Sequence, residues 1–137
     1  MAVTVPATKG RMEALGKLGS VAIGRATQRA HAVQTLKLTG EFDMSNAGEL
    51  ARAISHAIDA GMRDFVVDLS DVSFLDATTL DALVLGRKRV ASCNGEFALV
   101  RPRGVIWRLF VLTGLSVVFV TFASPEAALE YISSARD

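Results

Sequence analysis

Residues 64–80 read Asp-Phe-Val-Val-Asp-Leu-Ser-Asp-Val-Ser-Phe-Leu-Asp-Ala-Thr-Thr-Leu. The apolar run Phe65–Leu69 predicts a short strand in a parallel sheet that is covered on both faces. Helical spacing of apolar residues resumes at the end of the stretch, so a loop holding Asp76, Thr78 and Thr79 should join strand to helix. Free N–H groups and the helix dipole favour negative charge at a helix start. These side chains therefore either cap the helix or form a site that tolerates a phosphate.

Strand and helix patterns alternate on both sides of this stretch. The expected strands are 21–27, 32–39, 65–69, 97–100 and 117–122, and the expected helices are 47–58, 80–91, 105–112 and a last one from Pro125. Ser124 supplies a cap for that last helix, with proline at its first position. The polar residues 28–31 suggest a hairpin between the first two strands. The order ββαβαβαβα predicts one α/β domain with a mainly parallel sheet.

The composition restricts the classes of partner and location. A net charge of +1 gives no global attraction to nucleic acid or to an anionic membrane, so we expect no direct nucleic-acid binding and no membrane insertion. Residues 1–19 are expected to be a flexible or weakly helical extension, and 20–137 the folded domain. Neither a spanning stretch nor a signal-peptide pattern is found, which favours a cytoplasmic location. The single cysteine, Cys93, lies in an apolar helical pattern and is expected in the core.

Polar side chains follow three of the expected strands. Asp43 follows the second strand, Asp76, Thr78 and Thr79 follow the third, and Arg101 and Arg103 follow the fourth. Ligands and switches collect at the carboxyl ends of parallel strands. We therefore expect these groups to converge on one edge of the sheet.

Several kinds of catalysis lack their usual residues. The sequence contains neither a GxxxxGK[ST] nor a GxGxxG phosphate loop. His31 lies in a predicted turn and His56 beside an apolar helical stripe, so neither provides an evident base for a nucleophile. A phospho-aspartate receiver is disfavoured because only Asp43 follows the relevant strand and no lysine follows the last one. We expect no enzymatic activity, no cofactor and no metal, which leaves a hydroxyl switch that phosphorylation would charge by roughly −1.5 to −2.

Three segments together resemble a STAS domain, in particular the bacterial anti-sigma factor antagonists. They are Leu38–Asp43 (Leu-Thr-Gly-Glu-Phe-Asp), Val67–Leu80 and Thr113–Leu115, and the resemblance extends from about Ser20 to Ile132. It implies an α/β STAS fold: a mixed, mostly parallel sheet of about five strands with about four helices. It also implies that the helices lie mostly on one side of the sheet, in place of two well-covered faces.

The resemblance further implies a regulatory function. An antagonist of this family binds an anti-sigma factor with serine/threonine kinase activity and frees a sigma factor for transcription. The kinase phosphorylates a Ser or Thr two residues after the aspartate that ends the loop, which here is Thr78. The expected partner-binding residues are Asp43, Asp76, Thr78, Thr79 and Asp81.

The chain departs from the family pattern next to this site. The family commonly reads Asp-Ser-Ser/Thr-Gly-Leu-Gly, whereas residues 76–81 read Asp-Ala-Thr-Thr-Leu-Asp. Thr79 and Asp81 replace two glycines and could hinder a kinase. The alternative is therefore a non-phosphorylated STAS interaction module, in a stressosome-like assembly or as an accessory subunit of an ABC transporter.

Two further readings stay open. Trp107 and Phe110 belong either to the core or to an exposed apolar partner site, and self-association is left open. A small-ligand or nucleotide-binding domain is a third hypothesis, in which Arg101 and Arg103 would hold an anion, although loop arginines are more often solvated.

Overall fold

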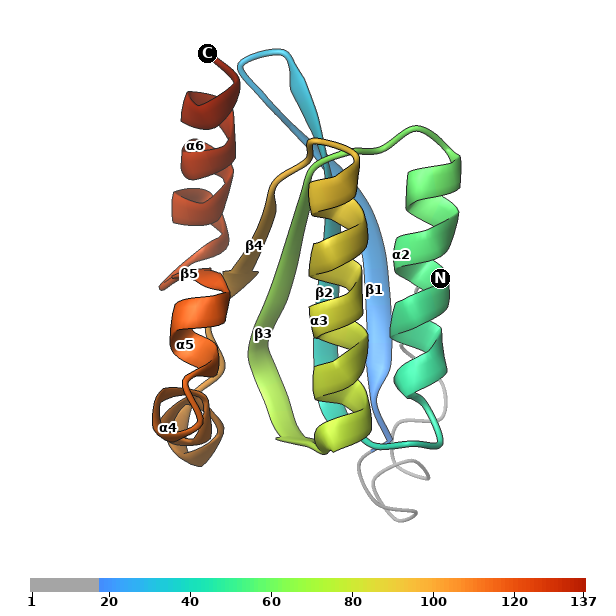
Figure 1. Cartoon of the computed structure of the whole chain (residues 1–137), viewed down its shortest axis with the longest axis vertical. Helices are drawn as coiled ribbons and strands as arrows, with labels where there is room; N and C mark the ends of the chain where they lie inside the picture. Colours follow the sequence, from blue (N-terminus) through green and yellow to red (C-terminus); the bar gives the residue numbers. More distant parts are fainter. Residues whose placement is uncertain (1–17) are drawn as a thin grey trace.

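The computed structural model describes residues 18–137, and Figure 1 shows their arrangement. The sheet has the strand order β1-β2-β3-β4-β5; β1 and β2 are antiparallel and the other neighbours are parallel. The strands are β1 (Ser20–Gln28), β2 (His31–Phe42), β3 (Phe65–Leu75), β4 (Phe97–Val100) and β5 (Val120–Phe122). The helices are α2 (Ala47–Asp59), α3 (Ala77–Ser92), α4 (Gly104–Leu112), α5 (Leu115–Val118) and α6 (Pro125–Arg136).

This mixed α/β sheet confirms the predicted fold and the predicted order of the main elements. The short helix α5 was not predicted, and it occupies the start of the expected last strand, so β5 begins only at Val120. Of the predicted amino-terminal extension, residues 1–17 lie outside the described residues. Within 18–137, none of the helices is long and apolar enough to cross a membrane.

The two faces of the sheet are covered unequally. Along β3 and β4, Phe65, Val67 and Leu99 face the main core under α2, α3 and α4. The alternate residues Val66 and Ala98 face the other side, where they pack with α6. The implied placement of helices mostly on one side is therefore confirmed, and the expectation of two fully covered faces is wrong.

The face of the sheet that packs against α6 is only partly covered, and its uncovered part is polar. Lys37 of β2 lies there, with its Nζ 3.1 Å from an Asp71 carboxylate oxygen and 3.6 Å from one of Asp68. The hydrogen bond to Asp71 raises the pKa of Lys37 and outweighs the opposing effect of burial. These two ion pairs, rather than apolar side chains, lie on the part of this face that α6 does not cover.

Strand β3 is longer than predicted, because the segment expected to be a loop continues it to Leu75. Its register with β2 shifts twice, between Lys37 and Thr39 and between Gly40 and Glu41, so β3 holds extra residues opposite β2. Such bulges change which side chains face the core. Only Asp76 then separates β3 from α3.

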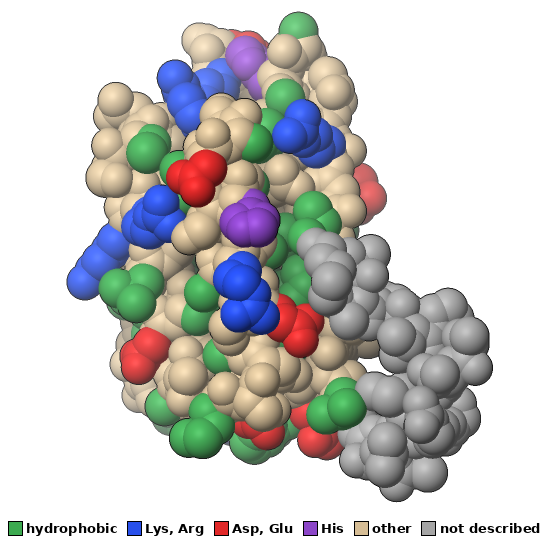
Figure 2. All heavy atoms as spheres, turned by 90° about the vertical axis from the view of Figure 1, so that its right-hand side faces the viewer, with side chains coloured by type: hydrophobic (Ala, Val, Ile, Leu, Met, Phe, Trp, Pro, Cys, Tyr) green, Lys and Arg blue, Asp and Glu red, His purple; other side chains and the backbone are tan. Residues whose placement is uncertain are grey.

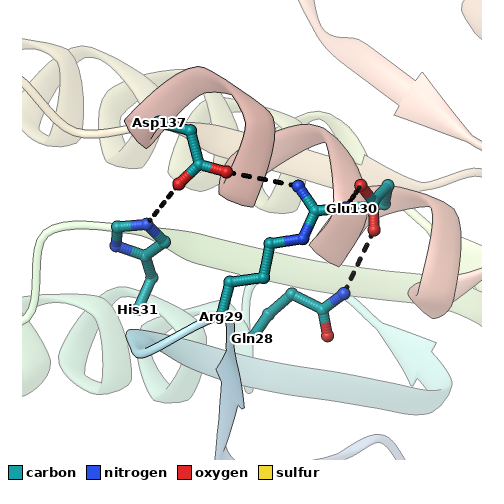
Figure 3. A network of polar contacts seen from close by, with 5 residues as sticks. All are labelled: Gln28, Arg29, His31, Glu130 and Asp137. Atoms are coloured by element: carbon teal, nitrogen blue, oxygen red, sulfur yellow. Dashed lines mark hydrogen bonds and ion pairs between the residues drawn. The ribbon is translucent and has the colours of Figure 1, made fainter.

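Polar contacts hold α6 at the end of the sheet where β2 and β3 begin, called here its amino-terminal end. Figure 3 shows the β1–β2 hairpin: Arg29 pairs with Glu130 at 2.6 Å and with Asp137 at 3.2 Å, and His31 Nε2 lies 3.1 Å from Asp137. Nearby, Arg136 donates to both carboxylate oxygens of the buried Asp64, at 2.6 and 2.9 Å. The hairpin and the start of β3 are thus attached to one helix.

Cys93 was expected in the core but is exposed. It is the residue after the last turn of α3, whose buried stripe ends at Val90. The apolar pattern that suggested burial therefore stops one turn earlier than the sequence indicated.

Candidate functional site

The carboxyl ends of β2 and β3 bring Asp43 and Asp76 to the same edge. Phe42 pairs with Leu75, and the N–H of Asp76 donates to the carbonyl oxygen of Phe42 at 3.1 Å. Each aspartate therefore directly follows one of two paired strand ends, as predicted.

Hydrogen bonds fix the loop after β2. The Asp43 carboxylate accepts bonds from the hydroxyl of Ser45 at 2.6 Å and from its N–H at 2.8 Å. These two bonds lower the pKa of Asp43. The cap position of α2 is Asn46, whose side chain accepts the N–H of Asp43 and donates to the carbonyl oxygen of Glu41.

Asp76 caps α3, and Thr79 completes the cap. The Asp76 carboxylate accepts the N–H of Thr79 at 3.1 Å and its hydroxyl at 3.3 Å. Thr79 is fully buried. Its side chain thus points into the protein, away from any docking partner. The capping interpretation of this stretch is correct for Asp76.

Thr78 has the opposite environment, because it is exposed in the first turn of α3. No hydrogen bond joins its side chain to another residue of 18–137. Asp81 and Leu85 follow at helical spacing and are also exposed, so the three residues share the outer face of α3. Thr78 therefore presents a free hydroxyl in the first turn of α3, with a carboxylate one turn away.

Two exposed apolar side chains that sequence reasoning missed flank the same edge. Met44 directly follows Asp43 and is 78% exposed, and Phe74 near the end of β3 is 49% exposed. In Figure 2, hydrophobic and acidic side chains gather at the lower end of the molecule, the end at which Figure 1 shows β3 finishing and α3 beginning. Phe74 was missed because this segment was expected to be a loop. In the strand, Phe74 alternates with Leu75, which packs against the main core, so Phe74 faces the other side of the sheet.

Arg101 does not join this edge, so its predicted convergence is wrong. β4 ends at Val100, opposite Asp68, whereas β3 continues for seven more residues to Leu75. At about 3.3 Å per residue, Arg101 therefore lies roughly 20 Å short of the edge. Arg101 instead lies over the Trp107 ring, 5.3 Å from its centroid.

A cavity of ≈ 450 Å³ lies elsewhere, between β1 and α2. Its floor is apolar and its rim carries Arg25, Arg52 and His56. None of the predicted site residues lines it, so the geometry does not connect it with Thr78.

Comparisons with known proteins agree with this architecture. The STAS domain family model matches residues 25–128. The anti-sigma-B factor antagonist of Staphylococcus aureus is 32% identical over 80 residues, which cover 58% of this chain and 74% of that protein.

Solved structures show the same fold. An anti-sigma factor antagonist from Mycobacterium paratuberculosis has a TM-score of 0.69 at 28% identity, covering 86% of this chain and 96% of that one. The phosphorylated form of the Bacillus cell fate determinant SpoIIAA has a TM-score of 0.62 at 20% identity, covering 81% and 97%. The second likeness concerns the fold alone. With the family model matching most of its length, the chain belongs to the STAS domain family.

Proposed function

We propose that this chain is an anti-sigma factor antagonist, which binds an anti-sigma factor with serine/threonine kinase activity and is switched by phosphorylation of Thr78. The observation that carries the proposal is the contrast between two adjacent hydroxyls: Thr78 is exposed and free, whereas Thr79 is buried and bonded to Asp76. Relatives named as antagonists support the general role. The proposed role is regulation of transcription by binding, without a reaction catalysed by this chain.

The proposed docking surface combines apolar contact area with negative charge. Met44, Phe74 and Leu85 are large exposed apolar residues near the start or on the outer face of α3. Asp43 and Asp81 are exposed among them. A partner should therefore present apolar pockets with a basic rim, since charge complementarity steers association and apolar anchors provide affinity.

Phosphorylation would change this surface without dismantling the helix. The γ-phosphoryl group of ATP would transfer to Thr78 Oγ1, its bond to the bridging oxygen would break to release ADP, and the hydroxyl proton would pass to a base of the kinase. The product adds roughly −1.5 to −2 charges in the first turn of α3, where the helix dipole tolerates an anion. The new charge would face Asp81 one turn away and the nucleotide phosphates of the bound kinase, so the complex should weaken.

The two departures from the family pattern have different consequences. Thr79 is buried, so its methyl group does not obstruct a kinase. Asp81 is exposed on the face of Thr78 and would repel the phosphates of ATP. This charge is the specific reason to retain the second candidate, a non-phosphorylated interaction module that uses the same surface.

A phosphorylation assay distinguishes the two candidates. The chain is incubated with ATP and candidate anti-sigma kinases, and phosphopeptides are mapped by mass spectrometry. We expect phosphate on Thr78, none in Thr78→Ala, and unchanged modification in Ser73→Ala, which removes a different exposed hydroxyl. Asp81→Gly should accelerate the reaction.

Binding is measured in parallel with the same kinases by calorimetry. Prior ATP treatment should weaken the binding of wild type, whereas Thr78→Ala should bind as tightly as unmodified wild type with or without that treatment. Leu85→Ser should weaken binding about tenfold, because an apolar anchor is lost. Phosphate on Ser70, Thr79 or nowhere would overturn the switch. Persistent binding without modification, still lost in Leu85→Ser, would establish the second candidate.

A further inference from the structure

Residues 97–125 have an unusual charge composition. They contain Arg101, Arg103 and Arg108 and neither aspartate nor glutamate, while the rest of residues 18–137 holds 9 Lys/Arg and 13 Asp/Glu. The near-neutral net charge of the whole chain therefore hides a locally cationic segment. This segment forms β4, α4, α5 and β5 at one edge of the sheet.

The same segment exposes many aliphatic side chains. On α4, Phe110 and Ile106 are buried, which answers the question left open for Phe110, and Trp107 is half-buried against the core. The opposite face of α4 is exposed and apolar apart from one arginine. We call the exposed residues the α4–α5 surface: Val105, Arg108, Leu109, Leu112, Val117 and Val118.

This surface protrudes at a corner. α4 and α5 are separated only by Thr113 and Gly114, and Gly114 has a positive φ of 82° that reverses the chain. Leu112 and Val117, on either side of this turn, are 74% and 85% exposed. Figure 1 shows the two helices at the outer edge of the molecule, beside β5.

We infer that the α4–α5 surface is a peripheral docking site for an anionic phospholipid surface. Aliphatic side chains on a convex corner can enter the boundary between headgroups and acyl chains, and nearby arginines then lie level with the phosphates. Arg103 at the start of α4 and Arg108 within its outer face are both exposed and suitably placed. Long arginine side chains keep their charge in water while their stems lie on apolar surface.

The observations favour lipid over a second copy of the chain. Self-association would bring two copies of this acid-free, arginine-bearing surface together, and like charges oppose such an arrangement. An anionic bilayer complements both the charge and the protruding aliphatic side chains. The inference does not depend on the proposed role of Thr78, which lies on α3.

Vesicle co-sedimentation with the full chain tests the inference. Phosphatidylcholine vesicles are compared with vesicles that also contain phosphatidylglycerol, and Trp107, the only tryptophan, reports depth through quenching by brominated lipids. We expect binding and quenching only with phosphatidylglycerol, and weaker binding at high salt. Arg108→Gln should reduce partitioning about fivefold, and Leu112→Ser combined with Val117→Ser about tenfold or more.

Leu85→Ser is the matched control, since it removes an exposed leucine from α3 and should leave partitioning unchanged. Thermal unfolding confirms that each variant is folded. Absent binding to phosphatidylglycerol vesicles, equal binding to both vesicles, or equal loss in Leu85→Ser would overturn the inference. A concentration-dependent dimer that disappears in the Leu112/Val117 variant, seen by light scattering without lipid, would identify a self-interface instead. A negative result here would leave the Thr78 assays unaffected.

Discussion

Aspartate substitutions at the two adjacent threonines should have very different effects on stability. Thr78→Asp adds a carboxylate to an exposed position in the first turn of α3, and Thr79→Asp buries one beside Asp76. The comparison tests directly whether only one of the two hydroxyls can carry a negative charge in the folded protein.

The size of the difference follows from the contacts. Thr79 Oγ1 lies 3.3 Å from Asp76 Oδ1. A carboxylate at position 79 would place two negative charges about 4 Å apart, and at an effective dielectric constant near 20 their repulsion is about 4 kcal/mol. The helix N-terminus would return about 0.3–1 kcal/mol. We therefore expect Thr79→Asp to lower the free energy of unfolding by about 3 kcal/mol, whereas Thr78→Asp should change it by less than about 1 kcal/mol.

Urea unfolding followed by far-ultraviolet circular dichroism measures both values, and equal m-values confirm comparable transitions. Thr79→Val is a control that keeps the side-chain shape and removes only the hydroxyl bond to Asp76, for a loss of about 1 kcal/mol. If Thr78→Asp were as destabilising as Thr79→Asp, or if Thr79→Asp were neutral, the assignment of one exposed and one buried hydroxyl would be refuted.

Three further predictions concern close packing, an ion pair and backbone strain at the opposite end of the sheet. Gly95→Ala should cost about 3 kcal/mol in urea unfolding, because its Cβ would lie 1.8 Å from the carbonyl oxygen of Arg63. Arg136→Met should also cost about 3 kcal/mol at neutral pH, because it leaves Asp64 buried without its cation. Burial raises the pKa of Asp64, but the hydrogen bonds from Arg136 and from a backbone N–H outweigh that effect and hold the pKa below the ordinary 3.8. As the pH falls below 3.8, wild type should therefore lose stability more steeply than Arg136→Met. Equal slopes of stability against pH in the two proteins would contradict this prediction. Ala30→Gly should raise the unfolding temperature by relieving the positive φ of 69° in the hairpin turn, a gain of about 0.5–1 kcal/mol, and an unchanged midpoint would argue against strain there.

Local signals in the sequence predicted most of the elements. β4 runs over Phe97–Val100 as expected, and α6 begins at the predicted Pro125 with Ser124 as its cap. These elements have strong local chemistry: a short apolar run in one case and a capping motif in the other.

The features that the sequence did not predict depend on pairing between distant segments. The last part of β3 is strand only because β2 is long enough to pair with it, and the first bulge then turns Val72 toward the main core. The difference between Thr78 and Thr79 is set by the rotation of α3 after Asp76, which a pair of identical residues cannot reveal. The sequence thus located the edge, and the three-dimensional pairing decided which of its side chains are exposed.

The two ends of the sheet separate the stabilising ion pairs from the proposed switch. The ion pairs of Arg29 and Arg136 lie at the amino-terminal end, and Thr78 lies beyond the carboxyl end of β3. The 11 residues of β3 span about 30 Å, several times the screening length of about 8 Å at physiological salt. A phosphate on Thr78 would therefore hardly affect the contacts that hold α6 to the sheet. Its charge would act mainly on whatever is bound at the edge, which is the condition for a switch that releases a partner while the domain stays folded.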